Sequence, residues 1–409
     1  MNSKRLKVGI YDPYLCELGG GERYVAIFAE TLQDHYDVEL MSHDSTSIYE
    51  IEKRFTLDLG NVKKRELPPK TGEKRTTNRR GWVRNLLEHR AEDRKDAQFT
   101  SEYDLFINLS NSIPNYSFAR NSILLLQMPY FDTSDDRLGD RTSLRERVRH
   151  RLFGASLTME EVLKLKCYQK KIANSHFTRK WIHRLWNVDC EVVYTGLDTS
   201  LFQPAPKENI ILSVGRFQPD LFCKNQHILV EVFKELCEEG LMGWELHMAG
   251  GVAEKPGQSE YFLRVKKAAE GYPIIFHPNA AFDELRDLYS RSRMFWHATG
   301  LTEDEVKTPW RMEHFGLTTV EAMSAGCVPV VINKGGQPEI VTNETDGFLW
   351  NTVDELKSRT MSLAEGTELE TKLRLRAMDR SHDFEKSLFQ RNIRAIVGSL
   401  QHSYEEAFV

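Results

Sequence analysis

Short runs of apolar residues alternate with longer amphipathic segments along the C-terminal half of the chain. Six apolar runs there predict strands, at 210–214, 245–249, 274–277, 294–297, 328–332 and 347–350. Four amphipathic segments between them predict helices, at 225–239, 260–270, 282–290 and 317–325. Alternation of strands and helices predicts a parallel sheet whose crossovers are right-handed. Ligands of such sheets bind at the carboxyl ends of the strands.

The N-terminal half has the same pattern with weaker periodicity. Apolar runs predict strands at 7–11, 37–42, 104–108, 122–126 and 192–196, and a helix is predicted at 156–171. After the first run, Gly19, Gly20 and Gly21 precede an amphipathic helix at 24–32. Strand, glycine turn and helix together can bind phosphate, although for the glycines alone a simple tight turn is the more common explanation. A dinucleotide fingerprint is not supported, because Gly-x-Gly-x-x-Gly is missing.

The length of 409 residues exceeds what one ordinary hydrophobic core organises, so we expect two α/β domains. Two prolines lie in the segment 198–208, which we interpret as the linker. The expected divisions are an N-terminal Rossmann-like domain at 1–200, a C-terminal Rossmann-like domain at 201–383 and a C-terminal helix at 384–409. Two further helices are predicted at 353–365 and 368–383.

One stretch concentrates the candidate chemistry. Glu313 lies just before the predicted helix 317–325, and Glu321 lies on its second turn. The free N–H groups of a helix N-terminus attract anions, and Gly316 lets a ligand approach the backbone. Two carboxylates beside an anion site suit a ligand with both phosphate and hydroxyl groups, such as a nucleotide sugar. For Glu321 a capping box with Thr318 is an equally good interpretation.

The stretch resembles a known family. Glu-x7-Glu is followed by Ala-Met-x-Ala-Gly-x-x-Pro-Val-Val and Gly-Gly-x-x-Glu-Ile-Val, which resembles the retaining glycosyltransferases of family 4. The Glu-His-Phe-Gly variant is similar to lipid-linked-oligosaccharide mannosyltransferases. The resemblance implies the GT-B fold, with two Rossmann-like parallel-sheet domains facing a cleft and a last helix that packs back on the first domain. It is specific in the C-terminal half and thinner in the N-terminal half.

The resemblance also implies roles for individual residues. Arg216 and Lys224 match the family's paired cations on the donor diphosphate, Glu313 would contact the transferred sugar, and these three form the expected catalytic set. Gln127 stands where many relatives have a histidine that contacts the donor sugar, so it is expected to contact the acceptor or the sugar. Its amide cannot accept a proton at neutral pH, which puts a general-base role there in doubt. The expected donor-binding residues are Glu321, Phe315, Gly316, Leu317, Gly20, Gly21, Gly250, Pro278, Asn279, Gly335 and Gly336.

Composition narrows the class of protein. A net charge of −5 and a pI near 6.3 argue against a dedicated nucleic-acid-binding protein. The six cysteines are scattered, which predicts reduced thiols rather than disulfides or a zinc site. No apolar run reaches 18 residues and no signal peptide is expected, so we predict a cytoplasmic protein. The acidic segment between Leu301 and Met312 reads as a solvated insertion rather than a metal site.

Two basic stretches stand out in this acidic chain. Between Lys63 and Lys95 there are 12 Lys or Arg residues and 5 Asp or Glu residues. Between Arg141 and Arg151 five arginines are interleaved with other residues. A solvated face is the ordinary explanation of each residue. Together the stretches predict peripheral contact with the inner face of an anionic membrane or with a diphosphate-linked lipid.

The sequence therefore predicts a retaining glycosyltransferase that needs no metal and no cofactor. Its donor would be a GDP- or UDP-hexose, with mannose favoured, and its acceptor a glycan or lipid-linked hydroxyl. The alternatives are a GT-B-fold sugar-nucleotide epimerase, a phosphorylase and a non-catalytic nucleotide-sugar-binding protein.

Overall fold

A computed structural model describes residues 5–68, 93–129, 157–219, 223–252 and 258–405. By its internal contacts the chain divides into two units. The first comprises Met1–Asn174, Thr178–Val193 and Gln390–Val409, and the second comprises Ser175–Phe177 and Tyr194–Phe389. Each unit is built on one parallel sheet, and the predicted α/β class with two Rossmann-like domains is confirmed.

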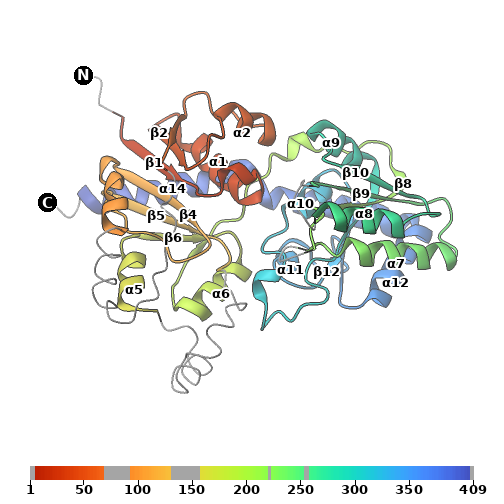
Figure 1. Cartoon of the computed structure of the whole chain (residues 1–409). Coiled ribbons are helices and arrows are strands. Elements are labelled where there is room, and N and C mark those ends of the chain that lie inside the picture. Colours follow the sequence, from red (N-terminus) through yellow and green to blue (C-terminus); the bar gives the residue numbers. More distant parts are fainter. Residues whose placement is uncertain (1–4, 69–92, 130–156, 220–222, 253–257, 406–409) are drawn as a thin grey trace, which may run out of the picture. The chain divides into compact units, whose positions relative to one another are not determined.

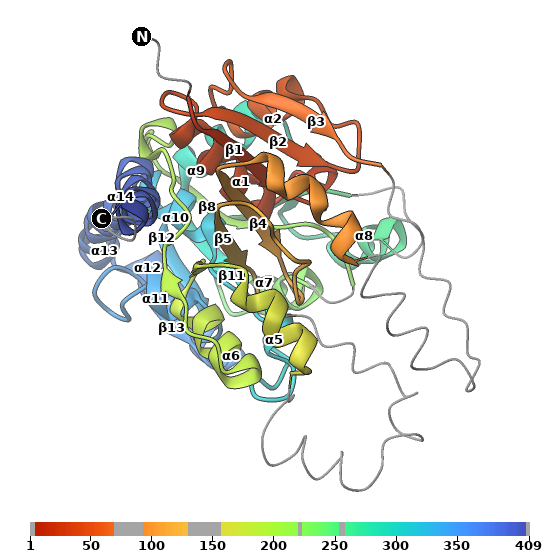
Figure 2. The same ribbon diagram turned by 90° about the vertical axis from the view of Figure 1, so that its left-hand side faces the viewer.

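The sheet of the first unit has seven strands in the order β3-β2-β1-β4-β5-β6-β7. The strands are β1 (Lys7–Tyr11), β2 (Asp37–Ser42), β3 (Lys63–Glu66), β4 (Leu105–Ser110), β5 (Asn121–Leu126), β6 (Lys170–Ala173) and β7 (Glu191–Val192). The helices are α1 (Gly20–Leu32), α2 (Ile48–Phe55), α5 (Met159–Lys166) and α6 (His176–Trp186). Figure 2 shows β1, β2 and β3 side by side, in red and orange.

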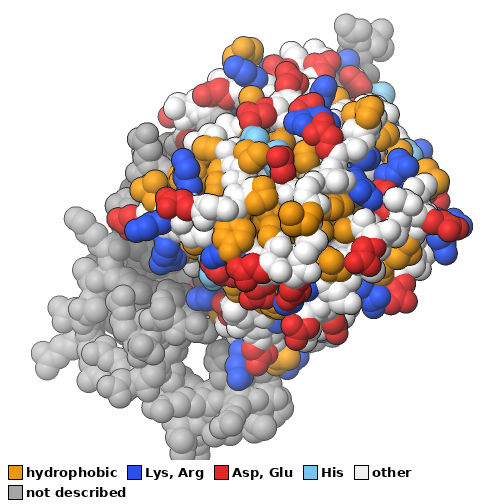
Figure 3. All heavy atoms as spheres, turned by 90° about the vertical axis from the view of Figure 1, so that its right-hand side faces the viewer, with side chains coloured by type: hydrophobic (Ala, Val, Ile, Leu, Met, Phe, Trp, Pro, Cys, Tyr) orange, Lys and Arg blue, Asp and Glu red, His pale blue; other side chains and the backbone are white. Residues whose placement is uncertain are grey.

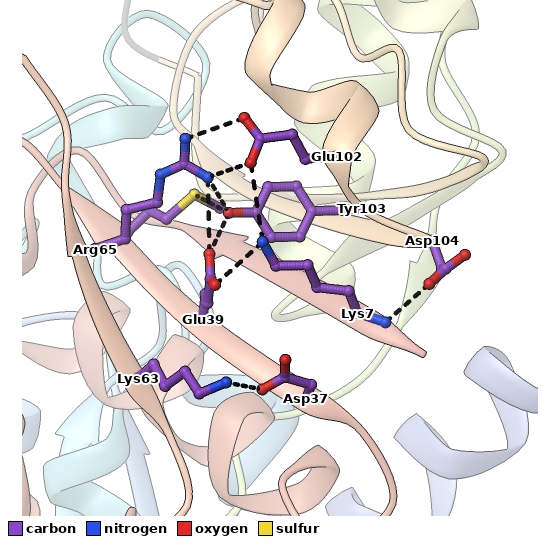
Figure 4. Close-up of polar contacts among 9 residues, drawn as sticks. Lys7, Asp37, Glu39, Lys63, Arg65, Glu102, Tyr103 and Asp104 are labelled. Carbon is purple, nitrogen blue, oxygen red and sulfur yellow. Dashed lines mark hydrogen bonds and ion pairs between the residues drawn. The ribbon is translucent and has the colours of Figure 1, made fainter. Parts of the chain in front are cut away.

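Polar contacts tie the strands of the first sheet together on one face. Arg65 of β3 pairs with Glu102 at 2.9 Å, and its guanidinium also donates to the hydroxyl of Tyr103 at 2.7 Å. Lys7 of β1 pairs with Glu39 of β2 at 3.1 Å (Figure 4). Gly9 makes room for this layer, since a Cβ there would lie 2.9 Å from the ring of Tyr103.

The sheet of the second unit has six strands in the order β10-β9-β8-β11-β12-β13. The strands are β8 (Glu208–Val214), β9 (Glu245–Gly250), β10 (Ile274–Pro278), β11 (Ser292–His297), β12 (Val328–Ile332) and β13 (Phe348–Trp350). The helices are α7 (Gln226–Glu238), α8 (Gln258–Ala268), α9 (Phe282–Arg291), α10 (Leu317–Ser324), α11 (Gln337–Ile340), α12 (Val353–Glu365) and α13 (Thr367–Ser381). Green and blue mark these elements in Figure 1.

Alternate residues of these strands enter hydrophobic clusters on opposite faces of the second sheet. Trp296 packs with α7 and α12 on one face, whereas its neighbour Phe295 packs with α9 and α10 on the other. Because helices cover both faces of this sheet, its strands have apolar residues at consecutive positions. This explains why the sequence located all six within two residues at each end.

Two predicted elements differ from the structure. The strand expected at 192–196 is shorter and lies at Glu191–Val192, where it forms β7. The helix expected at 156–171 ends at Lys166, and Lys170–Ala173 forms strand β6 between β5 and β7. The start signal of that helix is confirmed, because the Thr158 hydroxyl accepts from the Glu161 N–H.

The final helix α14 (Lys386–Glu405) starts in the second unit, and its residues from Gln390 group with the first.

Candidate active site

The strand order of the second unit reverses between β8 and β11, which lie side by side at the centre of the sheet. The connections that follow these two strands run in opposite directions from their carboxyl ends, and such a point forms a crevice that suits a ligand. Gly215 and Arg216 follow β8, and His297 ends β11. The candidate site is built at this point.

The turn after β8 brings Lys224 to the crevice. A Cβ on Gly215 would lie 2.6 Å from Cγ of Lys224, so the glycine gives room to the lysine stem. Asn225, in the left-handed conformation with φ of 54°, donates from Nδ2 to the carbonyl of Ala298 at 2.7 Å. This bond ties the lysine turn to the end of β11. Arg216, in the same turn, has an exposed side chain.

Lys224, Glu313 and His297 form a compact cluster. The Lys224 ammonium lies 2.6 Å from Oε2 of Glu313, and Nε2 of His297 lies 3.1 Å from the same oxygen. The hydroxyl of Thr299 lies 3.2 Å from His297 Nε2. The structure thus unites two predicted catalytic residues, Glu313 and Lys224, and adds a histidine that the sequence analysis did not select.

Charge and burial set the ionisation of this cluster. Burial alone would raise the pKa of Glu313, but the positive charge of Lys224 and the hydrogen bond from His297 outweigh it and hold that pKa well below its ordinary value. Burial lowers the pKa of His297, and Glu313 offsets only part of that effect. At neutral pH Glu313 is therefore an ionised carboxylate and His297 a neutral imidazole.

Two glycine turns pack closely around Glu313. Gly316 precedes α10 with φ of +115°, and Gly335 has φ of +63°, both in the region that favours glycine. The Gly336 N–H donates to the Glu313 carbonyl at 2.7 Å. A Cβ on Gly335 would lie 2.2 Å from that carbonyl oxygen. The predicted donor residues 315–317 and 335–336 therefore lie in one backbone cluster.

Glu321 has a different environment from Glu313. Its side chain is buried in α10, and Oε2 accepts a hydrogen bond from the hydroxyl of Tyr289 at 3.0 Å. The capping-box interpretation is wrong, because α10 begins after Gly316 and no side chain caps it. The hydroxyl of the neighbouring Thr319 donates to Oε1 of Gln337 at 2.9 Å.

The ends of β9 and β10 complete this edge of the sheet. Gly250 approaches the β8 turn so closely that a Cβ would lie 1.9 Å from the Gly215 carbonyl. Pro278 ends β10, and Asn279 follows with φ of 55° and donates its N–H to the Gly250 carbonyl at 2.9 Å. The Asn279 amide also accepts from the Val252 N–H at 2.8 Å. These predicted donor residues thus border the crevice from the β9 side.

The predicted residues of the first unit cluster at the carboxyl ends of its own strands. Gly20 and Gly21 open α1, and Gln127 follows β5. A Cβ on Gly21 would lie 2.0 Å from Nε2 of Gln127, so the glutamine amide lies directly against the glycine turn. Glu22 accepts from the Gly19 N–H at 2.6 Å and holds the turn.

Sequence reasoning missed His297, Tyr289 and Lys334 as parts of the site. The sequence could have identified His297, because a histidine at the carboxyl end of a buried strand, where the strand order reverses, lies at the edge of the sheet that binds ligands. Tyr289 carried none, since its partner Glu321 lies 32 positions away.

The insertion between Leu301 and Met312 is held by Lys334. Its ammonium donates to the carbonyls of Gly300, Leu301 and Glu303 at 2.9, 3.1 and 2.7 Å. The acids of the insertion have protein partners: Glu303 pairs with Arg311 at 2.9 Å, and Asp304 accepts from the Val306 N–H at 2.9 Å. These contacts agree with a structural loop.

The predicted basic surface is described only in part. Lys63 pairs with Asp37 at 2.6 Å, Lys64 donates to the Ser42 hydroxyl at 2.6 Å, and Arg65 pairs with Glu102. Residues 69–92 and the stretch from Arg141 to Arg151 lie outside the described residues. Acidic and basic side chains are interspersed on the face of the molecule in Figure 3. Within the described ranges, no helix is both long enough and apolar enough to span a bilayer.

Part of the chain matches a known protein family. Residues 201–380 match the family Glycosyl transferases group 1. The matched segment contains the whole cluster of Lys224, His297 and Glu313, together with Glu321.

Curated proteins are also similar to this chain. The human GDP-Man:Man(3)GlcNAc(2)-PP-Dol alpha-1,2-mannosyltransferase is 27% identical over 240 residues, covering 53% of this chain and 45% of the relative. Alpha-1,3/1,6-mannosyltransferase ALG2 of Dictyostelium discoideum is 24% identical over 344 residues, covering 73% and 76%. The chain spans about half the length of the alpha-1,2-mannosyltransferases that it matches.

Solved structures share the fold over almost the whole chain. Anabaena Alr3699/HepE in complex with UDP and glucose has a TM-score of 0.65 at 16% identity, covering 96% of this chain and 100% of that one. Sucrose-phosphate synthase from Thermosynechococcus elongatus has a TM-score of 0.67 at 17% identity, covering 98% and 100%. The predicted GT-B class, with its two Rossmann-like domains, is therefore shown.

Proposed function

We propose that this chain is a retaining glycosyltransferase. It moves a hexose, with mannose favoured, from a GDP- or UDP-sugar to a hydroxyl of a glycan or lipid-linked acceptor. Support for the sugar comes from relatives whose names specify GDP-mannose as donor. The UDP alternative has support from the Anabaena structure, which contains UDP and glucose.

The observation that carries the proposal is the Lys224–Glu313 pair at the sheet's reversal, at 2.6 Å. A nucleotide sugar brings a diphosphate, which needs positive charge, and a sugar ring, whose hydroxyls need acceptors. Lys224 and the exposed Arg216 supply the charge, and Glu313 supplies the acceptor beside it. Fixed charges placed where negative charge develops lower the barrier without covalent catalysis.

The proposed step breaks the bond between the anomeric carbon and the diphosphate oxygen. The acceptor hydroxyl forms the new bond on the same face of the sugar, so the anomeric configuration is retained. The acceptor's proton passes to the departing phosphate oxygen. Lys224 and Arg216 hold the charge of the leaving diphosphate, so the proposal includes no metal ion and no cofactor. Glu321, with Tyr289 as its partner, would hold the ribose hydroxyls.

Nucleotide binding is the first test. Purified protein is screened by thermal shift against GDP, UDP, ADP and their sugar conjugates, with Glu321→Ala and Arg216→Ala as variants. Ligand at about 100 times its dissociation constant adds roughly 2.7 kcal/mol to the free energy of unfolding. We expect one nucleotide to stabilise the wild type and neither variant. If no nucleotide stabilises the wild type, the nucleotide-sugar proposal is wrong.

Turnover is the second test. The stabilising sugar nucleotide is incubated with a short lipid-diphosphate glycan in the presence of EDTA, and the product is examined by NMR. We expect a new glycosidic bond with the donor's anomeric configuration. Release of free sugar without an acceptor, or a requirement for inorganic phosphate, would instead identify an epimerase or a phosphorylase.

We also propose a cytoplasmic enzyme that contacts the inner face of an anionic membrane peripherally. The support is the sequence of the two basic stretches, from Lys63 to Lys95 and from Arg141 to Arg151. Of the described residues, Lys63 and Arg65 already have acidic partners, so the contact would rest on the others. Co-sedimentation with phosphatidylserine vesicles at low and high salt tests it, because an electrostatic contact weakens as salt rises.

A further inference from the structure

The carboxylate of Glu313 uses only one of its two oxygens within the protein. Lys224 Nζ and His297 Nε2 both contact Oε2, at 2.6 and 3.1 Å. Oε1 has no hydrogen-bond partner among the described residues. The side chain keeps 19% of its surface exposed, so a ligand can approach it. The protein thus fixes one oxygen and leaves the other available.

The protonation of His297 follows from its partners. An ionised carboxylate only accepts hydrogen bonds, so the imidazole must donate from Nε2. Nδ1 of His297 is buried and has no hydrogen-bond partner among the described residues. A second proton on Nδ1 would place an unpaired N–H of a charged ring in a buried site, which is strongly unfavourable. The ring is therefore the neutral tautomer with its proton on Nε2.

The position of His297 is rigid. It is the last residue of β11, which lies between β8 and β12, and its side chain is only 3% exposed. The bond from Asn225 Nδ2 to the Ala298 carbonyl fixes the next residue to the Lys224 turn. A donor on a central strand is located more precisely than the mobile ammonium of a lysine.

We propose that His297 is a positioning residue that fixes Oε2 of Glu313 so that Oε1 faces the transferred sugar. This inference rests on the proposed function of the same site. An arriving diphosphate attracts Lys224 and weakens its contact with Glu313. The neutral histidine has no charge to offer the diphosphate, so it keeps the carboxylate in place. The ligand for Oε1 would be a sugar hydroxyl close to the reacting carbon.

Kinetics of two substitutions test the inference. His297→Leu removes the donor and keeps an apolar side chain, whereas His297→Gln can offer an amide N–H near the position of Nε2. We expect kcat to fall about 100-fold in His297→Leu, with little change in the donor KM, since the lost contact aligns the reacting sugar. We expect His297→Gln to recover activity to within about tenfold of the wild type.

A structural role would give a different result. It would lower the melting temperature and the affinity for nucleoside diphosphate together, and glutamine would not restore kcat selectively. Tyr272→Phe serves as a control, because it removes an exposed hydroxyl that contacts Glu238 at 2.6 Å near the amino end of β10, whereas the cluster lies at the carboxyl ends of the strands. Equal kcat in the wild type and His297→Leu would overturn the inference.

NMR of the unliganded protein tests the same idea without turnover. Among the 13 histidines, His297 is assigned by the signal that disappears in His297→Gln. We expect ¹⁵N shifts of a neutral ring protonated at Nε2 across pH 6 to 8. A charged ring, or a proton on Nδ1, would overturn the inference. If that tautomer is found but the wild type transfers no sugar, the proposed function fails while the local geometry stands.

Discussion

Replacement of Lys224 by methionine should destabilise the protein in a pH-dependent way. Methionine keeps an apolar stem beside Gly215 but removes the ammonium that lies 2.6 Å from Glu313. The remaining carboxylate then has His297 as its only described partner. Burial, which the lysine charge now outweighs, would raise the pKa of Glu313 in the variant.

The magnitude follows from the geometry. Two unit charges about 3 Å apart attract by roughly 5 kcal/mol at an effective dielectric constant of about 20. Removal of one partner of a fully buried pair costs about 3–5 kcal/mol, and an exposed pair contributes about 0–1 kcal/mol. The side chains of Lys224 and Glu313 are 22% and 19% exposed, which places the pair between these limits. We expect a loss of about 2 kcal/mol at pH 7.

The sign of the pH dependence can be worked out. The folded pKa of Glu313 lies below its unfolded value, so the pair contributes stability above about pH 4.3, and this contribution is lost as the pH falls further. In Lys224→Met the carboxyl has a raised folded pKa, so protonation stabilises the variant as the pH falls. The stability difference between wild type and variant should therefore be largest at neutral pH and should narrow on acidification.

Urea unfolding followed by circular dichroism, between pH 4.5 and pH 8, measures this difference. Glu313→Gln and the double variant complete a thermodynamic cycle, which isolates the interaction of the two side chains. We expect the double variant to be more stable than the sum of the two single losses predicts. A difference that does not change with pH, or losses that simply add, would refute this account of the cluster.

Three further outcomes are expected. Tyr289→Phe should lower stability by about 1 kcal/mol and weaken nucleotide binding by calorimetry, because Glu321 loses a buried hydrogen bond of 3.0 Å. Gly335→Ala should lower the melting temperature by several degrees, since φ is +63° and the new Cβ would lie 2.2 Å from the Glu313 carbonyl oxygen. Lys334→Met should increase hydrogen exchange in residues 301–312, because the contacts of the ammonium with the carbonyls of Gly300, Leu301 and Glu303 are lost.

The Gly335→Ala prediction has a matched control. Gly240 also has a positive φ, of +106°, but a Cβ there would meet no atom within 4 Å, so Gly240→Ala isolates the backbone contribution. If Gly240→Ala and Gly335→Ala lower the melting temperature equally, crowding against Glu313 is unimportant. Unchanged exchange of residues 301–312 in Lys334→Met would show that the lysine does not hold the insertion.

Local pattern predicted the fold well where strands are buried on both faces. The run 328–332 has no polar residue, and it forms β12 with the predicted bounds. Prediction failed at β6, because that strand begins with two lysines and follows directly on a true helix. Two consecutive charged residues look helical or exposed, and the strand is set by pairing of the lysines with β5 and of the next two residues with β7.

The sequence indicated which residues belong to the site, but it did not indicate which of them contact one another. Glu313 and Lys224 were selected because of the family resemblance, yet they are 89 residues apart and nothing local indicates an ion pair. Tertiary structure creates the pair by placing the carboxyl ends of β8 and β11 side by side. The capping box failed for a related reason, because Gly316 starts α10 earlier than the Thr318 pattern requires.

The two glutamates of one short motif have different hydrogen-bond partners, and this difference bears on how one site could serve both ends of a nucleotide sugar. Glu313 lies against a cation, so an incoming diphosphate competes with it for Lys224. Glu321 accepts a hydrogen bond from the neutral hydroxyl of Tyr289, on the covered side of α10. Under the proposed function, diphosphate binding would loosen the contact between Lys224 and Glu313, and the neutral donor of His297 would be needed at that moment. Loss of His297 should consequently disturb the position of the Glu313 carboxylate more in the complex with nucleotide sugar than in the free protein.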